Sequence, residues 1–320
     1  MKTNLTLSLI LLLALSACGP TEAQWSPPAT EPAPTEAPVV LAPATEAPAV
    51  LATATESQVS LATPTSEAFG FLTLFERAST RDPVRYAYAL DQGAQMLLSE
   101  DGRSFLLFWL PPGGDPNNPP PLIVSLHGEG AYAFDEFFAW HPRALEYGYG
   151  ILAVQWRVGA GESDADYYTA GEVHQVLQST LHMIKAQPGL NLLHGFGRGA
   201  ASIYALAALD ATSPSPYFRM TIANAGGANL DFSANQQISS GAFGSLPFLA
   251  THWFLYCGMQ DPNPDRDGCP AMQRTQEWLT GLGGTVDSFI QDPSGGHDGF
   301  LTDPENIRAA LSAFARIIQP

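Results

Sequence analysis

The sequence predicts an α/β domain with a mainly parallel β-sheet and helices on both faces. Several apolar segments lack the strict alternation of a half-exposed strand, as expected of parallel strands that are buried on both sides. Segments with helical periodicity separate most of them, and such alternation of strand and helix is typical of parallel sheets. A third observation is a glycine-rich turn between a strand and a helix, at 195–199.

The expected elements follow one another from residue 103 onward. Strands are predicted at 103–114, 121–130, 150–156, 190–194, 220–227, 251–258 and 285–292. Two prolines end the first of these strands, since proline cannot donate a ladder hydrogen bond. Helices are predicted at 171–189 and 271–283; the first has an apolar stripe on one face and ends at Pro188-Gly189.

Residues 1–18 are typical of a targeting segment. Lys2 precedes an apolar run, Leu7 to Leu15, that is too short to span a bilayer comfortably. The run ends in Leu15-Ser16-Ala17-Cys18, which resembles the lipobox of bacterial lipoproteins. The resemblance implies a lipidated Cys18 as the first mature residue, and an exported protein anchored to an envelope membrane outside the cytoplasm. The alternative is an ordinary secretory signal in which Cys18 is incidental.

Residues 19–68 form a predicted linker with a ten-residue repeat, "TEAPVVLAPA", "TEAPAVLATA" and "TESQVSLATP". Nine prolines in this segment prevent regular structure from propagating. Each repeat is too short to bury a face, so an extended spacer is favoured over a small solenoid. Residues 69–320 remain as one domain.

The charge and cysteine content limit the partners and the compartment. Residues 69–320 carry 13 Lys and Arg against 25 Asp and Glu, a net charge of −12. Such a surface argues against nucleic acid and against anionic lipid, so the membrane is reached through the lipid anchor only. In an exported protein Cys257 and Cys269 are expected to form a disulfide, with two free thiols as the alternative. The sequence predicts no oligomeric state.

The turn Gly195-Phe196-Gly197-Arg198-Gly199 follows a predicted strand and opens a helix. It has the frame of a G-x-S-x-G nucleophile elbow, in which Gly197 replaces the serine. The alternative is a glycine turn that binds phosphate at the helix N-terminus.

Three further turns complete the order of motifs. The first is His127-Gly128-Glu129, after a strand. The loop after the next-to-last strand contains Asp261, with Asp265 and Asp267 as alternatives, and His297 follows the last strand.

The loop that contains Asp261 could also be a calcium-binding loop, because it includes the calcium-loop spacing of Asn263, Asp265, Asp267 and Gly268. Arg274 occupies the position where such a loop needs Glu, so a solvated acidic loop is preferred. The other six histidines have no metal-ligand spacing, and neither a metal nor a cofactor is predicted.

Taken together, these motifs resemble the α/β-hydrolase superfamily, and more closely its secreted esterases and polyester depolymerases, over about residues 85–315. The resemblance implies a small ester as ligand. It also implies a nucleophile position at 197, a triad acid at Asp261 and a triad base at His297. The backbone N–H groups near Gly128, Glu129 and Arg198 would then form the oxyanion hole.

Glycine has no oxygen or sulfur to attack a carbonyl, so an acyl-enzyme at Gly197 is impossible. The sequence therefore favours a pseudo-hydrolase that binds without turnover. There are two alternatives. One is a hydrolase that uses water activated by His297 and Asp261, and the other is a purely structural surface domain.

Overall fold

The computed structural model describes residues 67–161 and 163–319. The predicted signal segment, Cys18 and nearly all of the predicted linker lie outside these residues. The first helix, α1 (Glu67–Arg81), begins two residues before the domain start predicted at residue 69.

Eight strands form a single sheet in the order β1-β2-β4-β3-β5-β6-β7-β8. Only β2 runs antiparallel to its neighbours, and the pairs from β4 to β8 are parallel. The predicted mainly parallel sheet is therefore confirmed. The strands are β1 Gln95–Leu98, β2 Phe105–Trp109, β3 Leu122–Leu126, β4 Gly150–Val154, β5 Asn191–Phe196, β6 Phe218–Asn224, β7 His252–Gly258 and β8 Thr285–Asp292.

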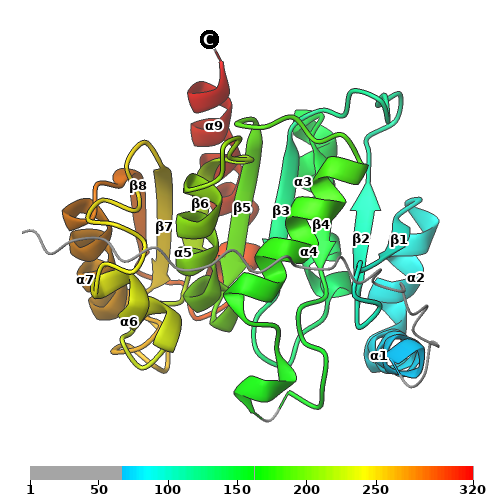
Figure 1. The fold of residues 1–320 in the computed structure, drawn as a ribbon, viewed down its shortest axis with the longest axis horizontal. Helices are drawn as coiled ribbons and strands as arrows, with labels where there is room; N and C mark the ends of the chain where they lie inside the picture. The colour runs from blue at the N-terminus through cyan, green and yellow to red at the C-terminus, as the bar shows by residue number, and fades with distance from the viewer. Residues whose placement is uncertain (1–66, 162, 320) are drawn as a thin grey trace, which may run out of the picture. The chain divides into compact units, whose positions relative to one another are not determined.

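Helices cover both faces of the sheet, and each face has its own apolar core. One core joins the sheet to α4–α7, and the other joins it to α1–α3, α8 and α9. Figure 1 shows α4 and α5 in front of the sheet and α9 behind it. The remaining helices are α2 Pro83–Asp91, α3 Ala133–Tyr147, α4 Ala170–Met183, α5 Arg198–Ala211, α6 Ser233–Ser239, α7 Cys269–Gly281, α8 Gly299–Thr302 and α9 Pro304–Ile318.

Helix α4 ends earlier than the sequence predicts. It stops at Met183, and Ile184 is its C-cap residue. Lys185 has a φ of 58°, a left-handed conformation that ends the helix before Pro188-Gly189 is reached.

The strand order places a topological switch point between β3 and β5. The chain moves from β3 to β4 on one side, and then crosses back to place β5 on the other side of β3. Ligands of open α/β sheets bind beyond the carboxyl ends of the strands at such a point. The turn at 127–129 follows β3 directly, and the turn at 195–199 begins in the last two residues of β5. Within the described part of the chain, no helix has the length and apolar character needed to cross a bilayer.

Candidate active site

The turn after β5 has the backbone of a tight strand-to-helix elbow. Gly197 has φ 53° and ψ −113°, a conformation that side-chain-bearing residues rarely adopt. The two flanking glycines are required by close packing. A Cβ at Gly195 would lie 2.5 Å from the carbonyl oxygen of Gly199, and one at Gly199 would lie 2.5 Å from that of Leu126. All three glycines therefore follow from the geometry of the turn.

The loops after β7 and β8 are held together beyond the ends of their strands. The N–H of Gln260 donates to the carbonyl oxygen of Gly295 at 2.9 Å. Gly258 allows this approach, because a Cβ there would lie 2.2 Å from the carbonyl oxygen of Gly296. The two loops carry Asp261 and His297, which are therefore fixed side by side.

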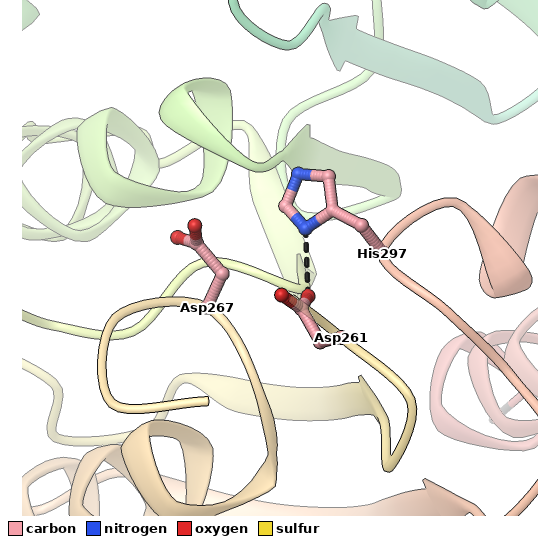
Figure 2. Close-up of side chains that lie close together, drawn as sticks. All are labelled: Asp261, Asp267 and His297. Carbon is pink, nitrogen blue, oxygen red and sulfur yellow. Dashed lines mark hydrogen bonds and ion pairs between the residues drawn. The ribbon is translucent and has the colours of Figure 1, made fainter. Parts of the chain in front are cut away.

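Asp261 and His297 form a hydrogen-bonded pair (Figure 2). Nδ1 of His297 lies 2.7 Å from Oδ2 of Asp261, and the Asp261 side chain is fully buried. The N–H of Asn263 donates to the other oxygen, Oδ1, at 2.8 Å. With Nδ1 donating to the carboxylate, Nε2 is left as the acceptor of the imidazole, and 35% of the His297 side chain is exposed.

The imidazole of His297 lies against Gly197. A Cβ at residue 197 would be 3.0 Å from Nε2 of His297 and 3.5 Å from Cε1. The first distance is shorter than an ordinary van der Waals contact. Phe196 packs on the other side, with ring centroids 4.9 Å apart. The histidine ring therefore occupies part of the volume that the side chain of a nucleophile would need.

The turn after β3 lies beside the same elbow. A Cβ at Gly128 would be 2.8 Å from the ring of Phe196, and the carboxylate of Glu129 is 3.7 Å from the guanidinium of Arg198. Arg198 begins α5, and the N–H groups of a first helical turn have no intrahelical partner. The structure thus brings the turn at Gly128 and Glu129 close to the helix N-terminus at Arg198.

His127 supports this turn from inside the protein. Its Nδ1 donates to the carbonyl oxygen of Gly128 at 2.8 Å, and the side chain is fully buried. Burial lowers the pKa of His127 to about 4. The residue is therefore neutral at physiological pH.

The two alternative acids occupy different positions. Asp267 is buried and lies close to His297 and Asp261, whereas Asp265 is exposed and is not part of this group. The Asp267 carboxylate lies beside the imidazole in Figure 2.

Two cavities adjoin the elbow. One, of about 430 Å³, is lined by Arg198 of the elbow and by aromatic residues that include Tyr167 and Phe232. The Arg198 guanidinium lies over the Tyr167 ring at 4.3 Å and pairs with Asp164. The other cavity, of about 720 Å³, is lined by Phe196, Glu129 and Asp298. The surface is therefore hollowed next to Arg198 and next to Phe196, the two neighbours of position 197 in the elbow.

A polar network that sequence reasoning missed lies beneath the elbow. Ser125 donates to Glu136 at 2.5 Å and lies 2.8 Å from Nδ1 of His194. All three are at most 1% exposed, so this serine cannot be reached by an ester. The network joins β3, β5 and α3, and only the three-dimensional structure brings its members together.

Cys257 and Cys269 form the predicted disulfide. Cys257 is the next-to-last residue of β7, just before the loop that carries Asp261, and Cys269 is the first residue of α7. The bridge therefore closes the loop that holds both Asp261 and Asp267.

No family model matches the chain, and no curated protein matches it by sequence. Solved structures do match. Thermogutta terrifontis esterase 2, described as phosphoramylated by tabun, is 14% identical with a TM-score of 0.50; the match covers 71% of this chain and 95% of that one. An esterase from Rhizomucor miehei is 10% identical with a TM-score of 0.53, covering 78% and 95%. Esterase B from Lactobacillus Rhamnosis (HN001) is 12% identical with a TM-score of 0.50, covering 77% and 94%.

The three similar structures are esterases, and each matches over most of its own length. At these identities the likeness concerns the fold. The strand order and the similarities together show that the described residues have the α/β-hydrolase fold.

Proposed function

We propose that this domain binds small carboxyl esters, or ligands that resemble them, without covalent turnover. Gly197 at the elbow carries the proposal, since position 197 offers no atom for nucleophilic attack. The close approach of the His297 ring to the Gly197 backbone supports it, because the site is shaped around the missing side chain. The domain would be a pseudo-hydrolase.

Binding is favoured over a purely structural role by the space around the elbow. A domain that served only as a surface support would have no need of open cavities that adjoin the elbow. Cavities of a few hundred Å³ with aromatic walls and a few polar groups are typical of small-molecule sites. The N-terminus of α5 and the neighbouring turn at Gly128 would hold the carbonyl oxygen of the ligand.

Covalent labelling tests the absence of a nucleophile. The Thermogutta terrifontis esterase is described as phosphoramylated by tabun. We expect the full-length chain to remain unlabelled by a fluorescent phosphonate probe and to bind a non-hydrolysable ester analogue in calorimetry. The matched variant Gly197→Ser should be labelled.

Strong labelling of the unmodified chain would show that another residue is the nucleophile. Absence of analogue binding would contradict a ligand-binding role. The Gly197→Ala variant controls for the added Cβ, because it has the same carbon and no hydroxyl.

The second candidate function is slow hydrolysis by an activated water. It is favoured by the Asp261–His297 pair, which holds Nε2 toward position 197 as a general base would be held. Sites without a complete triad retain roughly 10³–10⁴-fold acceleration over water. Ester hydrolysis by the unmodified chain that His297→Ala abolishes would favour this candidate.

We further propose that Cys18 is lipidated and that residues 19–68 act as a spacer. The domain would then be displayed from an envelope membrane outside the cytoplasm. The lipobox resemblance and the proline-rich repeats support this arrangement.

A further inference from the structure

Three potential metal ligands meet beside the elbow. Asp261, Asp267 and His297 each offer one donor atom, and these atoms all lie within 4.8 Å of one another. Two loops supply them, one after β7 and one after β8. Figure 2 shows Asp261 below the imidazole ring, joined to it by a hydrogen bond, and Asp267 to one side of the ring. Imidazole nitrogen and carboxylate oxygen together form a ligand set that transition metals accept.

Asp267 has an unusual environment for a carboxylate. The residue is 8% exposed, and 12% of its side chain remains accessible to solvent. Its ion-pair partner is Arg266, whose Nε is 3.8 Å from Oδ1, too far for a hydrogen bond. A mostly buried carboxylate is costly unless a nearby cation compensates its charge.

We propose that Asp261, Asp267 and His297 bind a divalent cation of the zinc class. Zinc binds carboxylate oxygen at about 2.0–2.2 Å and imidazole nitrogen at about 2.0–2.1 Å. The donor atoms must therefore draw closer together than in the metal-free arrangement, and rotation of the Asp267 side chain provides part of this movement. Calcium and magnesium prefer sets of oxygen ligands, so the histidine selects against both.

The cation takes the place of the proton that now lies between His297 and Asp261. When Nδ1 coordinates the metal, the proton of the neutral imidazole resides on Nε2. No proton is lost in this exchange. Nε2 then donates toward position 197 instead of accepting, so the metal removes the general base and supplies a donor for a bound ester oxygen. The consequence for Nε2 rests on the proposed function, whereas metal binding itself does not.

Zinc binding to the full-length, tag-free chain tests the proposal. After treatment with EDTA, the chain is titrated with zinc chloride in a calorimeter. We expect one site, a rise in the melting temperature with zinc, and no comparable response to calcium. Asp267→Asn should weaken zinc binding at least about tenfold, as expected of the loss of a direct ligand.

Asp265→Asn is the matched control. It removes the same charge from the same loop, but Asp265 is exposed and lies outside the group of three. Its zinc affinity should equal that of the unmodified chain. Circular dichroism and the absorption of bound cobalt(II) report on folding and on the ligand set of each variant.

Absence of zinc binding by the folded, unmodified chain would overturn the proposal. Equal zinc affinity of the Asp267→Asn and unmodified chains would also overturn it. Binding of the ester analogue is measured on metal-free protein, so its failure would contradict the proposed function and leave the metal site standing.

Discussion

At the scale of single residues, one missing side chain shapes the site. Gly197 offers no side chain, and Nε2 of His297 lies 3.0 Å from where a Cβ at this position would be. Glycine also relieves the backbone, because φ 53° with ψ −113° is unfavourable for any residue with a Cβ. Glycine therefore suits the backbone of this turn, and it offers no atom for covalent attack.

Restoring the serine should restore hydrolysis. In Gly197→Ser the hydroxyl would lie next to Nε2 of His297, once the ring has withdrawn by a few tenths of an ångström from the new Cβ. We expect hydrolysis of short-chain p-nitrophenyl esters to rise by at least about 10²-fold, a modest part of what a complete triad contributes. Gly197→Ala should show no rise. Equal rates for the two variants would mean that His297 and the serine do not act together.

His127 predicts a pH dependence of stability. Its pKa is about 4 in the folded protein, below the ordinary value of 6.5. Between these values the unfolded chain binds a proton and the folded protein does not, so stability falls as the pH is lowered from 6.5 to 4. The full difference corresponds to about 3 kcal/mol. Urea unfolding should show a smaller loss over this window in His127→Asn, whose amide can still donate to Gly128. An unchanged slope would contradict the assignment.

At the scale of elements, close packing of backbone segments determines the position of the elbow between β5 and α5. Strand β5 leads into α5 through a turn in which Gly199 lies against the end of β3. The contact places the start of α5 beside the turn at Gly128. The elbow therefore depends on two neighbouring strands and not on its own sequence alone.

The substitution Gly199→Ala should strongly destabilise the folded domain. Its Cβ would meet the carbonyl oxygens of Leu126 and His127 at 2.5 and 2.8 Å, which backbone atoms cannot avoid cheaply. We expect a loss of at least about 2 kcal/mol in the free energy of unfolding. Gly171→Ala in α4 is the control, because its Cβ would meet only the Thr169 hydroxyl at 3.9 Å. This change should stabilise by up to about 1 kcal/mol. Similar values for the two variants would contradict the packing argument.

The sequence predicted the strands that carry the site better than the surrounding helices. β4 is a continuous apolar run, and β3 is interrupted only by Ser125, so their burial on both faces is visible in the residues themselves. β5 contains the polar residues Asn191 and His194, but its Leu192-Leu193 and the glycine-rich turn that follows still mark it as a strand. α3 contains Pro142, a residue that ordinarily breaks helices, and it was not assigned from the sequence. The approach of Asp267 to His297 depends on how the loop after β7 folds, and no spacing along the chain reveals it.

The disulfide stabilises the loop after β7. Cys257 and Cys269 are 12 residues apart. Closing a loop of this length contributes about 3 kcal/mol in the chain-entropy model. The Cys257→Ala/Cys269→Ala variant should lose about this much in guanidinium unfolding. It should also bind zinc more weakly, because Asp261 and Asp267 lie within the loop. Unchanged stability and zinc affinity would show that packing alone holds the loop.

At the scale of the whole molecule, an acidic domain is joined to a long proline-rich segment. The net charge of residues 69–320 is −12, which repels anionic ligands and anionic lipid alike. We propose above that residues 19–68 act as a spacer; at about 3.1 Å per residue, a fully polyproline-like segment of this length would reach at most roughly 150 Å. A domain on such a spacer could meet neutral esters well away from the membrane surface.

The anchor itself is tested at Cys18. Two or more acyl chains on one residue give stable membrane attachment, whereas a single chain is marginal. The full-length chain, expressed in a bacterium that processes lipoproteins, should therefore sediment with membranes. Mass spectrometry of its mature N-terminus should find a lipidated Cys18. In Cys18→Ser the chain should move to the soluble exported fraction, while the Cys257–Cys269 disulfide still forms. An unmodified N-terminus at another residue would support the ordinary secretory signal instead, and the domain would then act free of any membrane.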